Sequence, residues 1–273
     1  MSWFEAIVMG IFQGIAEFLP ISSSGHLALL QHLFNIKEGN LFFTEMLHFG
    51  TLISIFIVYF KDIARIIYEF IELIISLLKR KPIKKLTKYQ WFGILIITGS
   101  VPTAIIGLTF KDFFESLYTS ILPIGIAFIV TGFLLWFAEN HKTEGKGIKD
   151  MKLKDSILIG IFQGIAIIPG ISRSGSTIVG GLFMGLKKPV ATEYSFLLAL
   201  PATFGAFLLG MRDVSKTGGA FVNGPLILGV FLSAVTGVLA IKMLIRILNK
   251  NKLRYFSYYL WILGAVTIVL SFF

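Results

Sequence analysis

A seven-residue stretch of this chain occurs twice. Residues 10–16 read GIFQGIA, and residues 160–166 repeat them letter for letter. At the same spacing, residues 21–22 and 24–25 match 171–172 and 174–175, so that 11 of the 16 positions from 10 to 25 recur without a gap. A match of this quality indicates a duplicated unit. It predicts two similar halves, each with one turn rich in glycine and serine.

The rest of the chain is strongly apolar. Hydrophobic residues make up 55% of the whole chain and charged residues 15%, whereas soluble domains carry about 25% charged residues. Several apolar runs approach the ~20 residues that a helix needs to cross a bilayer. The sequence therefore predicts an all-α polytopic membrane protein. Six crossings are expected, at 41–60, 91–110, 118–138, 192–211, 225–245 and 256–273.

The two repeated regions, 3–34 and 155–186, are apolar but broken. Proline, serine and glycine interrupt each of them near its middle. The pieces on either side of each interruption have roughly 12–16 residues, which is too short to span a membrane. Irregular backbone at this depth is tolerated only inside protein or beside a wet cavity. We expect two re-entrant helix pairs.

One further segment, 62–79, carries a charged stripe on an otherwise apolar helix, which favours a position along the membrane interface. Each copy then has a re-entrant pair plus three crossings. Because that number is odd, the second copy is inverted relative to the first. The expected fold is one membrane domain, 1–273, with two inverted-topology repeats. Repeat 1 covers 1–138, a cytoplasmic loop covers 139–154, and repeat 2 covers 155–273.

The basic residues agree with this topology. Of the 25 Lys and Arg, 20 fall on one expected side of the membrane and 4 on the other. The crowded side is the cytoplasmic one, so both termini are expected outside. The net charge of +10 is therefore attributed to membrane orientation, and no nucleic-acid partner is expected. The chain has no cysteine, which excludes thiolate chemistry.

Arg173 is the remaining basic residue, and the topology places it at membrane depth. A charge there costs about 2.5–3.5 kcal/mol on insertion scales, so it should be paired or functional. Ser172, Ser174 and Thr177 surround it at the start of a half-helix, a composition that suits a phosphate group. Arg173 can hold two anionic oxygens at once. The alternative is an arginine that ties the two repeats together through Glu17.

Glu17 and Gln13 lie four residues apart, on one helix face. Two oxygen-bearing side chains can hold a hard divalent cation together with phosphate oxygens of a substrate. The second copy keeps the glutamine as Gln163 but has Ile167 in place of Glu17. One copy thus supplies the carboxylate and the other the arginine, which predicts a single composite site. The alternative is a buried salt bridge without chemistry.

His26 follows a run of three serines. Histidine suits proton transfer near neutral pH, and a neighbouring serine is a nucleophile that it could activate. The alternative for His26 is a helix cap or a satisfied polar group. His32 and His48 are weaker candidates.

Residues 13–26 and 169–177 together resemble the two signatures of the undecaprenyl-diphosphate phosphatase family, also called bacitracin-resistance proteins. Residues 193–201 extend the likeness. The resemblance implies an enzyme of the bacterial plasma (inner) membrane whose site opens to the outer face. It would hydrolyse undecaprenyl diphosphate to undecaprenyl phosphate and inorganic phosphate, recycling the lipid carrier for cell-wall synthesis and conferring bacitracin resistance. A divalent cation, Mg²⁺ or Ca²⁺, is implied as cofactor.

The family's functional positions are carried over residue by residue. They fall on Gln13, Glu17, Ser23 and His26 in the first signature and on Ser172, Arg173, Ser174 and Thr177 in the second. Gln13 lacks the charge that glutamate has at this position in other members, which shifts weight to Glu17. Ser23 is the favoured nucleophile, with His26 as base; attack by His26, or by a water that Glu17 activates, stays open.

Two other functions are compatible with the sequence. Inverted repeats with broken helices are common in transporters, so a transporter or flippase of a phosphorylated lipid or other anion is the main alternative. The polar turns could also join helices in a structural membrane protein. The expected partners are a polyprenyl diphosphate and membrane lipids, and a homo-oligomer is compatible with the sequence.

Overall fold

The computed structural model describes residues 2–34, 41–80, 85–140, 145–217, 222–249 and 252–273. These residues form helices, and their only β-type pairing is an isolated bridge between Lys146 and Leu186. The first half contains α1 (Trp3–Phe18), α2 (Ser23–Leu33), α3 (Leu41–Val58), α4 (Phe60–Leu78), α5 (Lys88–Thr109), α6 (Lys111–Ser116), η2 (Leu117–Thr119) and α7 (Ile121–Asn140). The second contains η3 (Ile148–Asp150), α8 (Leu153–Ile165), α9 (Arg173–Phe183), α10 (Lys188–Thr217), α11 (Gly224–Asn249) and α12 (Arg254–Leu270). The all-α prediction is confirmed.

All six expected crossings are helices, but they differ in length. Helices α5, α7, α10 and α11 are each long and apolar enough to cross a membrane. α3 and α4 form a pair bent by 84° that counts as a fifth span if taken together, and α12 is an apolar helix of 17 residues. By length and composition, the described residues therefore hold four spans, or five with the bent pair. The chain is a multi-pass membrane protein.

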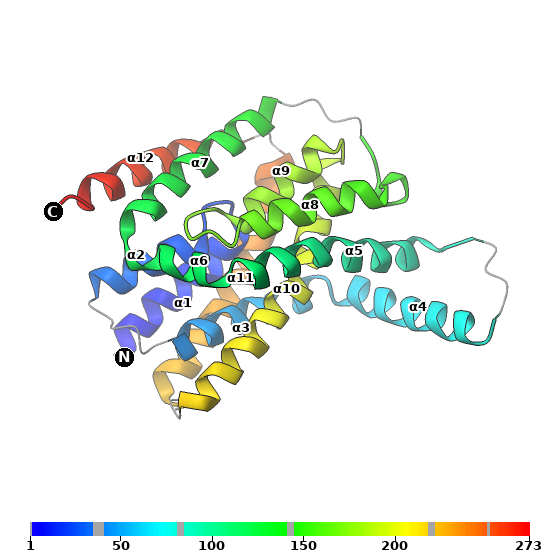
Figure 1. The fold of residues 1–273 in the computed structure, drawn as a ribbon, viewed down its shortest axis with the longest axis horizontal. Coiled ribbons are helices and arrows are strands. Elements are labelled where there is room, and N and C mark those ends of the chain that lie inside the picture. The colour runs from blue at the N-terminus through cyan, green and yellow to red at the C-terminus, as the bar shows by residue number, and fades with distance from the viewer. Residues whose placement is uncertain (1, 35–40, 81–84, 141–144, 218–221, 250–251) are drawn as a thin grey trace.

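The charged stripe of the expected interfacial segment lies on a separate helix, α4. The bend after α3 sends α4 away from the helix bundle, where it packs on α5 to form a projecting hairpin (Figure 1). Ile63, Ile66 and Leu73 are the buried residues of this helix, whereas Ile67 and Ile71 are exposed. An exposed apolar face beside a charged stripe is typical of a helix at a lipid interface. Its depth in the membrane stays a prediction.

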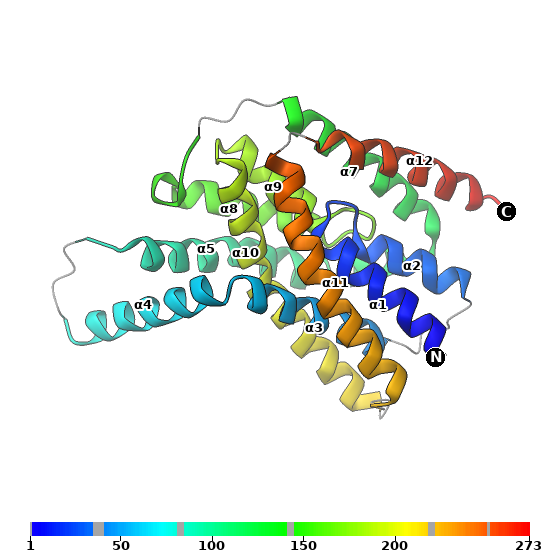
Figure 2. The ribbon, with the colours of Figure 1, turned by 180° about the vertical axis from the view of Figure 1, so that it is seen from behind.

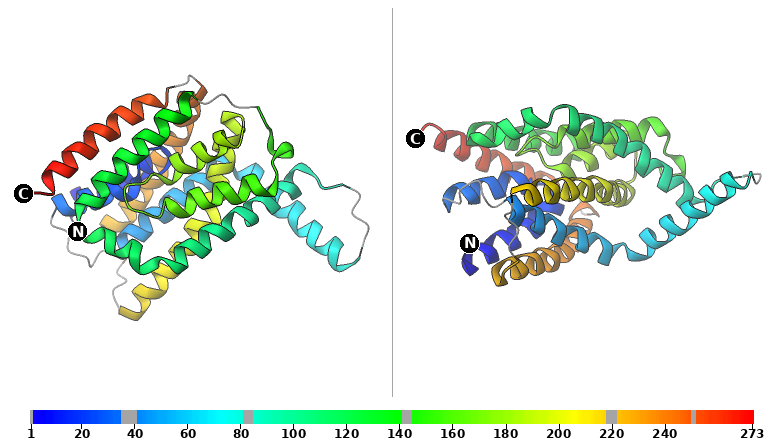
Figure 3. Two further views of the ribbon diagram at one scale, coloured as in Figure 1. Left: turned by 45° about the horizontal axis from the view of Figure 1, so that its top comes forward. Right: turned by 60° about the horizontal axis from the view of Figure 1, so that its bottom comes forward.

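The two broken segments form helix pairs, α1–α2 and α8–α9, as expected. Each pair reverses direction at its Gly/Ser-rich turn, and the two turns lie side by side in the middle of the molecule (Figure 2). Both chain termini lie at one end of the molecule, and the far end of the α4–α5 hairpin lies at the opposite end (Figure 3). Each pair thus approaches the centre from a different end.

The two halves interlock through equivalent contacts. α1 packs on α11, and its counterpart α8 packs on α5. A Cβ added to Gly10 would lie 2.5 Å from the carbonyl oxygen of Gly229, and one added to Gly160 would lie 2.0 Å from that of Gly99. Small residues allow this close approach of helix backbones in membrane proteins. Each half therefore supplies the partner helix for the broken pair of the other.

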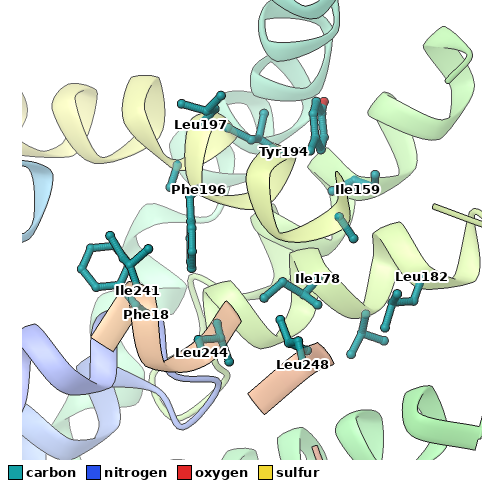
Figure 4. Packing of buried hydrophobic residues seen from close by; sticks show 14 of the residues in the cluster. Phe18, Ile159, Ile178, Leu182, Tyr194, Phe196, Leu197, Ile241, Leu244 and Leu248 are labelled. Carbon is teal, nitrogen blue, oxygen red and sulfur yellow. The ribbon is translucent and has the colours of Figure 1, made fainter. Parts of the chain in front are cut away.

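A buried apolar cluster supports the centre of the molecule (Figure 4). Phe18, the last residue of α1, meets Phe196 of α10 edge-on at 5.3 Å between ring centroids. Ile178 of α9 and Leu244 of α11 belong to the same cluster. The ends of the broken helices consequently pack against two other helices, α10 and α11.

The boundary between the expected repeats falls between α7 and α8. The expected loop, 139–154, holds the end of α7, η3 and the start of α8, while 141–144 lie outside the described residues. Four other lysines from the expected distribution of basic residues also lie outside them: Lys37, Lys81, Lys84 and Lys250.

Candidate active site

The first broken pair presents a serine to a carboxylate. Glu17 lies in the last turn of α1, and Ser23 is the first residue of α2. Ser23 Oγ donates a hydrogen bond to Glu17 Oε2 at 2.5 Å. The intervening Ser22 caps α2 by accepting from the Gly25 N–H at 3.3 Å. A hydroxyl next to a carboxylate is the arrangement in which a serine can lose its proton.

Ser22 has an uncommon backbone conformation, with φ 70°. Its counterpart in the second turn, Ser172, has φ −72° although the local motif is the same. The difference arises two residues earlier. Gly170 takes φ 93° in the second turn, whereas the equivalent position in the first turn is Pro20, whose ring fixes φ near −65°. In the first turn the residue with positive φ is therefore Ser22, directly before Ser23. A positive φ strains the backbone of a non-glycine residue, and strained residues are concentrated at functional sites.

The two turns pack against each other in the same way. A Cβ on Gly25 would lie 2.9 Å from Cα of Gly170, and a Cβ on Gly175 would lie 3.2 Å from Cβ of Pro20. Gly25 and Gly175 are equivalent positions of the repeat, as are Pro20 and Gly170. This reciprocal contact brings the start of α9 beside the end of α1.

Arg173, the first residue of α9, pairs with Glu17 across this contact. Its Nη2 bonds to Glu17 Oε1, and its Nη1 donates to Thr203 Oγ1 of α10. The Glu17 side chain is 3% exposed and that of Arg173 23%. The carboxylate and the guanidinium that the sequence assigned to one composite site are thus in direct contact.

The other oxygen of Glu17 has two further neighbours. Gln13 Nε2 donates to Glu17 Oε2 at 3.0 Å, and His48 Nε2 of α3 lies 3.9 Å from the same oxygen. Gln13 Oε1 is buried and has no hydrogen-bond partner within the described part of the chain. A buried acceptor without a donor is suited to a water molecule or a cation.

The three hydroxyls expected around phosphate are engaged in the fold. Ser172 Oγ accepts from the Gly175 N–H at 3.1 Å, and Ser174 Oγ donates to the Leu19 carbonyl at 3.2 Å. Thr177 Oγ1 and Ser195 Oγ are 2.5 Å apart. A cavity of about 10 Å³ lies beside Ser174 and Ser195, with room for about one water molecule. Its lining is Glu17, Phe18, Arg173, Ser174, Ser195, Phe196 and Ala199.

His26 is buried with both ring nitrogens occupied. Nδ1 lies 2.8 Å from the Ser22 carbonyl oxygen, and Nε2 lies 2.6 Å from the Tyr259 hydroxyl of α12. Among the described hydrogen bonds, none joins this ring to Ser23 or to Glu17. Both ring nitrogens of His26 are therefore hydrogen-bonded within the fold, one of them to the backbone of the Ser22–Ser23 turn.

A family model described as bacitracin resistance protein BacA matches residues 6–266. The chain belongs to the BacA family. A relative from Alkaliphilus metalliredigens is 52% identical over 273 residues, covering 99% of each chain, and is named undecaprenyl-diphosphatase. Relatives of the same name from Carboxydothermus hydrogenoformans and Halothermothrix orenii are each 42% identical, over 99% of this chain and 98% and 99% of theirs, respectively.

The candidate site includes residues that the sequence did not single out. Thr203 and Tyr259 contact Arg173 and His26 from helices far away in the chain. His48, a weaker candidate in the sequence, has its Nε2 3.9 Å from Glu17 Oε2. The only available signal was a polar side chain in an apolar span, which many residues share.

Proposed function

We propose that this protein hydrolyses undecaprenyl diphosphate to undecaprenyl phosphate and inorganic phosphate. The names of the relatives at 42–52% identity support this substrate. The reaction returns the lipid carrier for cell-wall synthesis, and by lowering the amount of carrier diphosphate it confers bacitracin resistance. The strongest structural support is the contact of one hydroxyl, one carboxylate and one guanidinium at the meeting point of the two broken helices.

Substrate binding starts with exchange of the partners of Arg173. The cavity beside the Glu17–Arg173 pair holds about one water molecule, so a phosphoryl group needs more room. The phosphoryl oxygens can replace the Glu17 carboxylate as the hydrogen-bond acceptors of Arg173, because Arg binds phosphate through two parallel hydrogen bonds. Glu17 is then released as a base within reach of Ser23.

Ser23 attacks the terminal phosphorus in the next step. Its proton passes from Oγ to Glu17 Oε2 along the existing hydrogen bond. A bond forms between Oγ and phosphorus, the bond from phosphorus to the bridging oxygen breaks, and undecaprenyl phosphate leaves with the electron pair. Arg173 balances the charge on the transferring group. Water then attacks the phosphorus of the phosphoserine, the bond between Oγ and phosphorus breaks, and Glu17 returns its proton to Oγ. Inorganic phosphate leaves with the oxygen and both protons of the water.

The protein's own groups fit a divalent cation only in part. Among the described residues, no group of three or more His, Asp or Glu side chains is arranged to hold a metal. Gln13 Oε1 is a free buried acceptor, and Glu17 supplies a carboxylate beside it. Mg²⁺ or Ca²⁺ takes six or more oxygen ligands, so Gln13 and Glu17 would hold it together with diphosphate oxygens and water. When bound, it would offset negative charge on the diphosphate.

We also propose that the two halves are inverted repeats in the bacterial inner membrane, with both termini outside and the site open to the outer face. The 20-to-4 distribution of basic residues supports this orientation. The reciprocal packing of α1 on α11 and of α8 on α5 supports the repeat relationship.

Phosphate release from purified protein in detergent tests the function. Undecaprenyl or farnesyl diphosphate serves as substrate, with and without a chelator, and Glu17→Gln serves as the inactive control. We expect phosphate from the wild type at rates that depend on added cation. A pure transporter or flippase would release none, and that result would end the proposal.

A further inference from the structure

Tyr259 is connected through two hydrogen bonds to Ser22, the residue directly before the reacting serine. Its hydroxyl lies 2.6 Å from His26 Nε2, and His26 Nδ1 lies 2.8 Å from the Ser22 carbonyl oxygen. A carbonyl can only accept, so the ring proton of the neutral imidazole is on Nδ1. Nε2 then accepts from the Tyr259 hydroxyl. The direction of both bonds is therefore fixed by chemistry.

The carbonyl at the end of this chain belongs to the strained residue. Ser22 has φ 70°, and its carbonyl is part of the peptide bond to Ser23. A non-glycine residue stays in this region only when its surroundings hold it there. The His26 ring holds the carbonyl from one side, and the Ser22 hydroxyl holds the Gly25 N–H.

The imidazole is itself held by aromatic neighbours. Phe128 meets it edge-on at 5.3 Å between ring centroids, and Phe12 stacks on it at 6.2 Å. The plane of the Tyr259 ring is nearly parallel to that of the imidazole, at an interplanar angle of 8°. The aromatic neighbours restrict rotation of the imidazole about its Cβ–Cγ bond, and the hydrogen bond from the Tyr259 hydroxyl holds Nε2 in place.

We propose that Tyr259 is a positioning residue for Ser23. Through His26 it keeps the Ser22–Ser23 peptide in the orientation that points Ser23 Oγ at Glu17. The role deepens the proposed hydrolase function and rests on it for its kinetic effect. Tyr259 is 41% exposed on a predicted span, where lipid offers its hydroxyl no alternative partner. Removal of the hydroxyl therefore leaves His26 Nε2 without its partner.

The test uses full-length protein in detergent. Tyr259→Phe removes the hydroxyl and keeps the ring, so it leaves no cavity. Tyr258→Phe is the matched control, because this neighbour on the same helix is 48% exposed and its ring packs on Trp261 instead. His26→Asn keeps a donor for the Ser22 carbonyl but removes Nε2. The kcat and KM of each variant are measured with a polyprenyl diphosphate.

Tyr259→Phe should lower kcat about 3- to 10-fold, the effect of one hydrogen bond, with KM changed less than twofold. Tyr258→Phe should match the wild type. Adding Tyr259→Phe to His26→Asn should cause no further loss, because the bond is already absent. Wild-type kcat in Tyr259→Phe, or losses that multiply in the double variant, would overturn the proposal.

Amide hydrogen exchange provides a readout that does not depend on activity. Peptides covering residues 19–27 should exchange faster in Tyr259→Phe than in Tyr258→Phe, because the first turn of α2 is held less firmly. Equal exchange in the two variants would also overturn the positioning role. Faster exchange in a protein that hydrolyses no diphosphate would leave this role intact and reject the proposed function alone.

Discussion

Glu17 and Arg173 are 156 residues apart in the chain and form an ion pair between the two halves of the molecule, in which Glu17 is buried and Arg173 half-buried. Each comes from the turn region of a different broken helix pair, and the other copy of the repeat has neither residue at the equivalent position. The molecule therefore has one such site, to which the first copy contributes the carboxylate and the second copy the guanidinium.

Replacing Arg173 by Ala should lower phosphate release by about 10²–10³-fold, the usual effect of removing one donor to a developing charge. Arg173→Lys should recover part of the rate, since lysine keeps the charge but not the two parallel hydrogen bonds. Initial rates at saturating substrate measure both. A rate for Arg173→Ala near that of the wild type would exclude the guanidinium from the reaction.

Glu17→Gln should reduce kcat by at least about 10²-fold, because the amide cannot accept the Ser23 proton. The amide oxygen still accepts from Arg173, so the melting temperature should change little. Glu115→Gln is the control, since this carboxylate is exposed on α6 beside Lys111. If both variants have the same kcat, Glu17 is not the base.

The nucleophile can be identified with two adjacent serines. Ser23→Ala should abolish turnover, whereas Ser24→Ala should keep most of it, because Ser24 bonds to Ser22 rather than to Glu17. Substrate labelled in its terminal phosphate should leave label on Ser23 after rapid acid quench. Full activity of Ser23→Ala would assign the attack to water or to His26 instead.

The cation requirement should depend on Gln13. Gln13→Leu removes the unpartnered buried acceptor and should raise the cation concentration for half-maximal activity about 10-fold, within the range for weakened metal ligation. Gln163→Leu alters the equivalent position, where Ile167 stands in place of a carboxylate, and should leave this concentration unchanged. Titration of chelator-treated protein with Mg²⁺ or Ca²⁺ compares the two. An equal shift in both variants would remove Gln13 from the cation site.

The glycine contact between α8 and α5 should be essential for stability. Gly160→Ala places a methyl group 2.0 Å from the Gly99 carbonyl oxygen, and backbone must move to admit it. Gly205→Ala in α10 meets no atom within 4 Å and should be tolerated, with a gain in helix propensity. Melting temperatures in detergent measure both. Equal melting temperatures would show that α8 and α5 can move apart with little loss of stability.

Much of this architecture could be predicted from the sequence. Apolar run length defined the crossings, and interrupted runs defined the broken pairs. The pairing of Glu17 with Arg173 followed from two observations: Arg173 was the only basic residue expected at membrane depth, and the copies had diverged at these positions. Such statements need only composition and spacing along one chain.

Contacts made by side chains of other helices could not be predicted. Thr203 and Tyr259 reach the site only because α10 and α12 pack where they do, and nothing in their local sequence indicates this. The conformation of Ser22 is a second example. Its motif is the same as that of Ser172, but the choice between φ 70° and φ −72° depends on Pro20 and Gly170.

The exchange of partners between the halves has a consequence for biosynthesis. α1 ends at residue 18, but the helix on which it packs, α11, does not begin until residue 224. While the ribosome is still adding the intervening helices, the newly inserted α1 has its glycine surface facing lipid or a chaperone. α1 can therefore pack on α11 only after most of the chain has been made. Glu17 likewise contacts Arg173 only after the second broken helix pair has been inserted.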